Sequence, residues 1–365
     1  MEASADLYNA ALEQRRDAWR KQRVFVDLYD QQRQLTDLRA SMPEWADIPL
    51  RVERSVLRRL DRAFRGFFRR VRNGESPGYP RFRSRARYDS ITLPVGGKEW
   101  TRVVDDRIVL PRMGPVRFRR YRELRGKPLE LRLHRSYGRW YVSIVCDLGD
   151  APAKIPVRNA VGIDLGLTTF ATLSNGEEVA NPRFLRSGED LLARRQRSLA
   201  RKRRGSNSRH RAKRLVARAH EHVRNQRIDF ARKEAKKLFD RFDMIAYEDL
   251  QVARMVHGNL AKSIYDASWT TFIHALTCKA EEAGKWCVSV DPRGTTQRCS
   301  GCDKVVHKDL SQREHRCDGC GLVLGRDENA ARNVLALGLS AGLLTEASSE
   351  VWPYLMDKGS GSDVG

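Results

Sequence analysis

The stretch VGIDLGLTTFATLSNGEEVA, residues 161–180, contains three short apolar runs separated by polar and glycine residues. Runs of this length that are rich in β-branched residues are typical of strands. We predict strands at Val161 to Leu165, Phe170 to Leu173 and Glu178 to Ala180. Three adjacent strands of this kind suit the start of a layered α/β fold.

The sequence that follows alternates helical and strand patterns. The predicted elements are long basic helices from about Glu189 to Asp240, a strand at Met244 to Tyr247, a helix from about Tyr265 to Ala283, a strand at Cys287 to Val290 and a helix from Asp327 to Leu337. Three strands followed by this alternation describe an α/β layer of the RNase H-like type.

The first half of the chain has a different organisation. Residues from about Leu7 to Arg39 have a helical pattern, and from about Leu50 to Val71 apolar side chains recur at three- and four-residue spacing among arginines. From Arg107 to Leu148 the period changes to two, which predicts a small antiparallel β module. Residues 151–156, with two prolines, are a candidate domain boundary.

The charge of the chain is strongly unbalanced. Its 365 residues carry a formal net charge of +23, and the excess is largely arginine, whose planar fork pairs with phosphates. We therefore expect a polyanionic partner and favour a nucleic acid over a membrane surface or a ribosome. No stretch approaches the roughly 20 apolar residues of a membrane span, and the start has no signal pattern, which predicts a cytoplasmic, nucleoid-associated protein without a membrane partner.

Three acidic residues stand in or beside predicted apolar elements. Asp164 lies in the first apolar strand, where an unpaired charge would be costly to bury unless it sits at an exposed end. Glu248 follows the next apolar strand, with Asp249 as the competing candidate, and Asp327 begins the last predicted helix, where an ordinary N-cap is the alternative. Two-metal phosphodiester cleavage needs carboxylates that converge from distant parts of a chain. The order strand, strand, helix matches the layout of a RuvC-type site.

Four of the seven cysteines form two Cys-x-x-Cys pairs. The pairs are separated by fourteen residues, the spacing of a zinc ribbon, and consist of Cys299, Cys302, Cys317 and Cys320. A site closed by four thiolates organises a loop without doing chemistry, so we predict one structural Zn²⁺ ion. His307 and His315 lie inside the loop and could replace a ligand, but polar surface histidines are the preferred interpretation.

Two segments are predicted to contact nucleic acid. Residues 79–88 interleave aromatic residues with Arg81, Arg83 and Arg85, which suits bases stacked on rings and phosphates held by guanidinium groups, although a solvated loop is the alternative. The densest charge lies between the first two candidate acids, where it would border their cleft unless it is only a solvated face. It consists of Arg194, Arg195, Arg197, Arg201, Lys202, Arg203, Arg204, Arg209, Arg211, Lys213 and Arg214.

Five motifs together resemble the TnpB/OrfB proteins of insertion sequences, which are relatives of the type V CRISPR effector nucleases. They are GIDLGLTTF (162–170), YEDL (247–250), VDP (290–292), TTQRCSGC (295–302) and RDENAARN (326–333). The resemblance covers most of the chain, from about Leu7 to Leu339.

The resemblance implies a monomeric nuclease loaded with a guide RNA from the transposon end. Such a protein recognises a short motif beside its double-stranded DNA target and cuts the DNA with Mg²⁺. The implied catalytic acids, which would hold two Mg²⁺ ions, are Asp164, Glu248 and Asp327, and the implied zinc ligands are the four paired cysteines. The implied domains are a helical recognition segment (1–90), a β-barrel wedge-like module (91–156), a RuvC/RNase H-like nuclease domain (157–340), a zinc-ribbon insert within it (293–325) and a flexible tail (341–365).

The chain departs from the family pattern in three places. Family members usually begin with an additional strand and turn before the segment that resembles residues 7–12, so the wedge barrel is expected to lack a strand. Gly325 stands where an acid often precedes the Arg-Asp pair, and Asp303 stands where glycine is common. Two other functions stay open: a guide-dependent DNA-binding protein with weak or absent cleavage, and an unguided nuclease or transposase.

Overall fold

The chain folds into two compact units, Met1–Gly149 and Asp150–Gly365. The computed structural model describes residues 1–42, 45, 48–96, 101–110, 114–255, 257–309 and 311–343. The division of the chain between Gly149 and Asp150 lies close to the boundary predicted at residues 151–156. Within the described ranges, no helix is long and apolar enough to cross a membrane.

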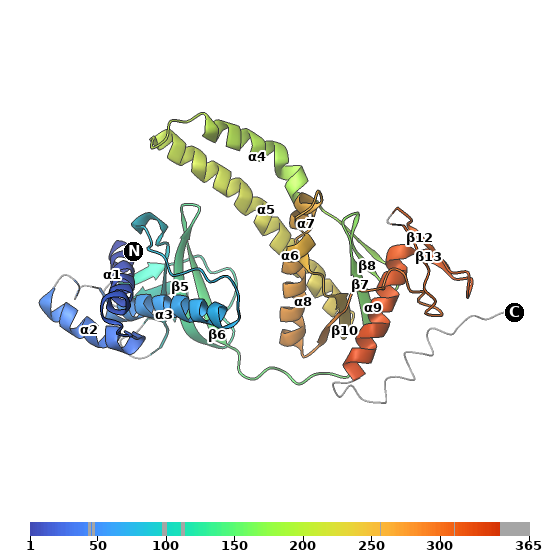
Figure 1. The fold of residues 1–365 in the computed structure, drawn as a ribbon, viewed down its shortest axis with the longest axis horizontal. Helices are drawn as coiled ribbons and strands as arrows, with labels where there is room; N and C mark the ends of the chain where they lie inside the picture. Colours follow the sequence, from blue (N-terminus) through green and yellow to red (C-terminus); the bar gives the residue numbers. More distant parts are fainter. Residues whose placement is uncertain are drawn as a thin grey trace. The chain divides into compact units, whose positions relative to one another are not determined.

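The first unit begins with three helices that share a core (Figure 1). They are α1 (Glu2–Asp17), α2 (Leu28–Ser41) and α3 (Leu50–Arg72), with a π-helical turn at Ala18–Gln22. The helical pattern predicted from about Leu7 to Arg39 is confirmed except for a break at residues 23–27. Arg23 adopts the left-handed conformation (φ 57°) that ends a helix, and a reciprocal capping box between Asp27 and Asp30 starts α2.

The strands of the first unit form two antiparallel sheets. The strands are β1 (Ser90–Pro94), β2 (Arg102–Val104), β3 (Arg107–Leu110), β4 (Gly114–Arg117), β5 (Lys127–Ser136) and β6 (Arg139–Asp147), after a 3₁₀ turn at Arg85–Arg87. The sheet orders are β1-β5-β6 and β2-β3-β4, and Val52 of α3 packs on apolar residues of both sheets. In the described residues each sheet keeps edge strands, so the strand pairing does not close the predicted barrel.

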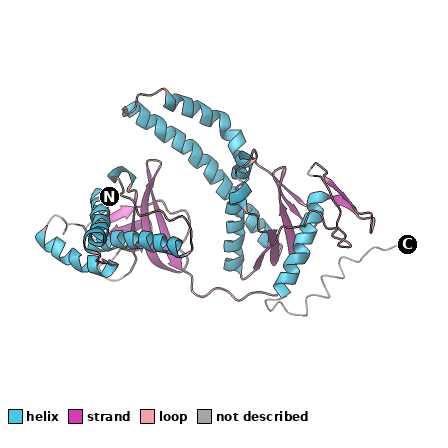
Figure 2. Cartoon of the chain, in the orientation of Figure 1, coloured by secondary structure: helices cyan, strands magenta, loops and turns pink. Residues whose placement is uncertain are grey.

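The second unit contains a five-stranded sheet between helices (Figure 2). Its strands are β7 (Ala160–Leu165), β8 (Thr169–Leu173), β9 (Glu178–Ala180), β10 (Met244–Glu248) and β11 (Trp286–Val290), in the order β11-β10-β7-β8-β9. Strands β7, β10 and β11 are parallel, whereas β8 and β9 are antiparallel to their neighbours. The strand positions agree closely with those expected from the apolar runs.

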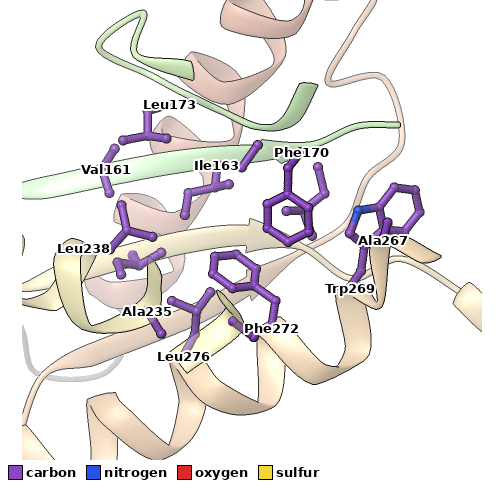
Figure 3. Close-up of a cluster of buried hydrophobic side chains, with 14 of the residues drawn as sticks. Val161, Ile163, Phe170, Leu173, Ala235, Leu238, Ala267, Trp269, Phe272 and Leu276 are labelled. Atoms are coloured by element: carbon purple, nitrogen blue, oxygen red, sulfur yellow. The ribbon is translucent and has the colours of Figure 1, made fainter. Parts of the chain in front are cut away.

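Helices pack on both faces of this sheet. The helices of the second unit are α4 (Phe184–Ala200), α5 (Asn207–Phe239), α6 (Val252–Met255), α7 (Ala261–Ala267), α8 (Trp269–Ala283) and α9 (Arg326–Leu343). Of these, α5, α8 and α9 contact the strands of the sheet. On one face, residues of α5 and α8 such as Leu238 and Phe272 pack against Ile163 and Phe170 (Figure 3). The helix predicted from about Tyr265 to Ala283 is divided, because Ser268 adopts a left-handed conformation (φ 55°) between α7 and α8.

Helix α9 lies against the other face at unusually short range. A Cβ atom added to Gly162 of β7 would lie 2.1 Å from the carbonyl oxygen of Ala331 in α9. One added to Gly338 of α9 would lie 2.4 Å from Cβ of Ala246 in β10. Glycine at both positions therefore permits the close packing of helix and sheet. Helix α9 continues to Leu343, so the first three residues of the predicted tail are helical, and residues 344–365 lie outside the described ranges.

Candidate active site and metal centre

Asp164 and Glu248 lie side by side at the ends of neighbouring strands. Strands β7 and β10 are parallel, with Ile163 paired to Tyr247, so the next residue of each strand is an acid. Asp164 is half-buried, and Glu248 is only 6% exposed. The competing candidate Asp249 is exposed, which leaves Glu248 as the acid that accompanies Asp164.

Asp327 completes the group from helix α9. It lies in the first turn of the helix, where the helix dipole favours a negative charge. Its carboxylate oxygens lie 3.2 Å from Nε of Arg326 and 3.8 Å from a guanidinium nitrogen of Arg313. Asp327 is close enough to Asp164 for its charge to act on that carboxyl group. The structure therefore places Asp164 beside Glu248, with Asp327 within range of the charge of Asp164.

The surroundings of Asp164 disfavour the ionised form of its carboxyl group. Burial, together with the charges of Glu248 and Asp327, raises the pKa of Asp164 from 3.8 to about 8, and Arg326 only partly opposes this. Burial also raises the pKa of Glu248. Grouped acids whose ionised forms are disfavoured are typical of functional sites.

Thr295 is a site residue that the sequence analysis missed. Its hydroxyl donates a hydrogen bond of 2.6 Å to Oε1 of Glu248 and is buried. Thr295 lies in one of the quoted motifs, but no periodicity or spacing distinguishes it from the adjacent Thr296. Its contact depends on the tertiary path of the loop after β11.

The four paired cysteines form one cluster beside a small hairpin of β12 (Glu314–Arg316) and β13 (Val323–Gly325). All four sulfur atoms lie within 4.8 Å of one another, with Sγ–Sγ distances of 3.6 Å for Cys299 and Cys320 and 3.5 Å for Cys302 and Cys317. Backbone hydrogen bonding, first from Cys320, lowers the pKa of Cys317 to about 6. The cluster could hold a metal ion.

The two histidines of the loop differ from each other. His307 is exposed, as predicted, whereas His315 is fully buried, so its assignment to the surface is wrong. Nζ of Lys308 lies 2.5 Å from Nδ1 of His315, and burial lowers the pKa of this imidazole. Neither histidine belongs to the group of four sulfur ligands. His315 is the buried residue of β12, whose other two residues, Glu314 and Arg316, are exposed.

The predicted basic run lies on the hairpin formed by α4 and α5. Most of its side chains are exposed, and in the described part of the chain none of the eleven forms an ion pair with a carboxylate. Arg209 instead donates to the carbonyl oxygens of Leu199 and Lys202, which shapes the turn. A surface hollow in this region is lined by Arg194, Arg197, Ser198, Arg201 and Lys202.

A buried carboxylate that the sequence analysis missed fixes the base of this hairpin. Asp266 of α7 accepts hydrogen bonds from the backbone N–H groups of Leu185 and Arg186, at the start of α4, and from Arg227 of α5. Because α4 begins without a side-chain cap of its own, Asp266 caps it from another helix. Only the tertiary structure reveals this role.

The aromatic and basic segment 79–88 makes several contacts within the first unit. Arg85 forms an ion pair with Asp6, and the guanidinium group of Arg83 lies over the ring of Tyr8. Arg81 is exposed. Of the three predicted binding residues, Arg83 and Arg85 thus contact other residues of the first unit, and Arg81 is exposed to solvent.

The first unit also contains a cationic pocket that the sequence analysis did not single out. It lies between α3 and the sheet that contains β1, and has a volume of about 140 Å³. Its lining includes Arg59, Arg62 and Arg132, and the hydroxyl groups of Ser55 and Ser90. Guanidinium and hydroxyl donors of this kind suit a phosphate group.

Comparison with known proteins gives the family. A family model described as "Probable transposase" (OrfB_IS605) matches residues 143–258, and a model of the Cas12f1-like TNB domain matches residues 269–334. A "Putative RNA-guided DNA endonuclease" of Streptomyces pristinaespiralis is 34% identical over 351 residues, which cover 92% of this chain and 83% of the relative. The chain belongs to the TnpB/OrfB family. The resemblance found in the sequence motifs is thus confirmed.

Other TnpB/OrfB relatives agree with this assignment. The "Putative RNA-guided DNA endonuclease InsQ" of Escherichia coli K12 is 31% identical over 317 residues, which cover 82% of this chain and 77% of the relative. The structure of a Cas12f1-sgRNA-target DNA complex has a TM-score of 0.59 at 13% identity, and the match covers 91% of this chain and 80% of that one. The fold is therefore similar to that of a Cas12f effector, with mixed α/β content.

The two family models divide the TnpB/OrfB site between them. The first includes Asp164 and Glu248, and the second includes the four cysteines and Asp327. The acidic group thus forms where the matched segments meet in the fold.

Proposed function

We propose that this TnpB/OrfB chain is an RNA-guided DNA endonuclease that hydrolyses DNA phosphodiesters at Asp164, Glu248 and Asp327. The observation that carries the proposal is the meeting of these acids from β7, β10 and α9, with the pKa of Asp164 raised to about 8. Hard carboxylate oxygens are the protein ligands that suit Mg²⁺. The relatives named RNA-guided DNA endonucleases support the substrate and the guide.

The acids fit a site that holds two Mg²⁺ ions. Bound Mg²⁺ ions would activate water and steady the leaving oxygen of the phosphodiester. Asp164, on which the charges of both other acids act, would hold the ions together with them and would lose its proton when they bind. Glu248, held by Thr295, and Asp327, on the rigid start of α9, would complete the ligand set.

The cysteine cluster fits a structural Zn²⁺ ion. With Zn–S bonds of about 2.3 Å, the sulfurs of a tetrahedral site lie about 3.8 Å apart, close to the distances observed here. Backbone N–H groups of Gly301 and Gly319 donate to Sγ of Cys299 and Cys317, and such bonds favour a thiolate. For Cys317 hydrogen bonding lowers the pKa, whereas burial raises the pKa of Cys299. The ion would order the ribbon and take no part in cleavage.

The chain would bind its guide RNA and target DNA through its cationic surfaces. The hairpin of α4 and α5 and the arginine pocket of the first unit are suited to phosphates. In this proposal residues 157–340 form a RuvC-type nuclease domain with the zinc ribbon at 293–325, and residues 1–90 and 91–156 form the recognition helices and the wedge-like module. A monomer would act with one guide RNA, whose base pairing reads the DNA beside a short flanking motif.

The test is to purify the protein with its co-expressed flanking locus, sequence the bound RNA and assay Mg²⁺-dependent cleavage of a matching duplex. We expect a defined RNA and cleavage that Asp164→Ala abolishes, while binding of RNA and DNA is retained, because the substitution removes a metal ligand and no phosphate contact. Full cleavage by Asp164→Ala would contradict the assignment of the site. A defined RNA with tight binding and no cleavage by the wild type would instead favour a protein that only occupies its target.

A further inference from the structure

The loop between β11 and the first cysteine touches the acidic group directly. Thr295 is 2% exposed, and its hydroxyl lies 2.6 Å from Oε1 of Glu248 and 3.0 Å from the carbonyl oxygen of Pro292. A hydroxyl has one proton to donate. The carboxylate oxygen of Glu248 is nearer than the carbonyl oxygen of Pro292 and is the stronger acceptor, so it receives the proton. Thr295 therefore fixes one oxygen of Glu248 and leaves the other available.

Helix α9 holds the same loop through two asparagines. The side-chain amide of Asn333 donates to the carbonyl oxygens of Thr295 and Arg298, each at 2.7 Å. Asn329, which is fully buried, donates to the carbonyl oxygen of Arg298 at 2.7 Å and accepts from the backbone N–H of Ser300 at 2.9 Å. Ser300 lies between Cys299 and Cys302, so Asn329 binds directly to the turn that carries these two cysteines, residues 299–302.

These contacts form a continuous path from the cysteine cluster to the acids. The path runs from the turn at Ser300 through Asn329 to α9, which also carries Asp327, and from α9 through Asn333 and Thr295 to Glu248. Asp327 and Asn329 are separated by one residue on a single helix. A displacement of the cysteine turn would therefore move two ligands of the acidic site.

We infer that Thr295, Asn329 and Asn333 are positioning residues that couple the metal-loaded cysteine cluster to the catalytic carboxylates. In this role Zn²⁺ binding sets the geometry of Glu248 and Asp327, and with it the affinity for the catalytic cations. Some residues hydrogen-bond to a metal ligand without touching the metal. Removing such a residue typically lowers metal affinity or activity about 10–100-fold. The inference rests on the proposed function of the acids.

The first experiment compares Thr295→Val with Thr295→Ser. Valine keeps the shape of threonine without its hydroxyl, whereas serine keeps the hydroxyl. Mn²⁺ binding to the full-length chain is measured by electron paramagnetic resonance of the free ion, with Asp164→Ala as the reference for a lost site. We expect Thr295→Val to weaken Mn²⁺ binding about 10–100-fold and Thr295→Ser to restore it. In the cleavage assay kcat should fall, while KM for the DNA stays unchanged.

The second experiment breaks the path at its other end. Asn329→Ala leaves all four cysteines in place, and Asn225→Ala, at an exposed position of α5, is the matched control. We expect Asn329→Ala to weaken Mn²⁺ binding at the acids and to speed the release of Zn²⁺ to a chromogenic chelator, and the control to change neither. Wild-type Mn²⁺ affinity in Thr295→Val and Asn329→Ala, with binding lost in Asp164→Ala, would overturn the coupling alone. Wild-type affinity in Asp164→Ala as well would overturn the proposed site together with it.

Discussion

Replacing Asp164 with asparagine should stabilise the protein while it abolishes cleavage. In the absence of divalent cations and above its pKa, the Asp164 carboxylate is ionised while half-buried beside Glu248 and within reach of the charge of Asp327. The amide of asparagine has nearly the same shape and no charge. A site that is built to hold cations is expected to be under electrostatic strain when it holds none.

The size of this effect follows from the pKa of Asp164. One pKa unit corresponds to about 1.4 kcal/mol, so the rise from 3.8 to about 8 sets a ceiling of about 6 kcal/mol. Because Asp164 is half-buried and water relaxes around it, we expect about 2 kcal/mol, or a rise in Tm of about 4–8 °C for a unit of this size.

The sign of the pH dependence is fixed by the direction of the shift. The folded state raises the pKa of Asp164, so the folded state binds more protons than the unfolded state between pH 3.8 and about 8. Wild-type stability therefore falls relative to Asp164→Asn as the pH rises through this window, and the gap is constant above it. Below pH 3.8 the two proteins should be equally stable.

The assay is thermal unfolding of both proteins from pH 5 to pH 9, without added divalent cations and without a chelator that would remove Zn²⁺. Added Mg²⁺ should raise the Tm of the wild type more than that of Asp164→Asn, because the wild type has the better cation site. A Tm difference that is independent of pH, or a less stable Asp164→Asn protein, would refute the reasoning.

Three other predictions concern binding, metal and packing. Neutralising Arg201, Arg203 and Arg204 together should weaken nucleic-acid binding and lower the slope of log K against log salt by about 0.7–0.9 per lost phosphate contact, measured by fluorescence anisotropy; an unchanged slope would make these residues a solvated face. Cys317→Ser should remove the single equivalent of Zn²⁺ expected in elemental analysis, because it deletes a ligand whose thiolate form is favoured by backbone hydrogen bonds. Gly162→Ala should destabilise the protein by about 1–3 kcal/mol or more in denaturant unfolding, since its Cβ would lie 2.1 Å from a carbonyl oxygen of α9.

The sequence predicted the elements that have a clear apolar pattern. Four of the five strands of the second unit could be placed because each is a short apolar run, and the exception is β9, which begins with Glu178. The meeting of Asp164 and Glu248 follows from two parallel strands that end at the same edge. The breaks at Arg23 and Ser268 could not be predicted, because both residues adopt a left-handed backbone that their side chains do not favour.

The residues that support the site were also beyond prediction from the sequence. Thr295, Asn329 and Asp266 act through hydrogen bonds to segments distant in the chain, and such contacts leave no periodic pattern. His315 was assigned to the surface because histidine is polar, but in the hairpin of β12 and β13 it pairs with Leu324 and is fully buried. The sequence thus predicted the candidate ligands of the site but not the residues that orient them.

The close packing of α9 explains how acids from distant segments can meet accurately. At Gly162 and Gly338 helix and sheet lie too close for a Cβ atom. A shift of α9 along β7 would place larger side chains at these two points of contact, where they would clash. The position of α9 along β7 is thereby fixed, and with it the position of Asp327 in the first turn of α9. The same register places Asn329 and Asn333 against the loop that carries Thr295. Two glycines with no chemistry of their own therefore set the positions of one acid directly and of Glu248 through the loop.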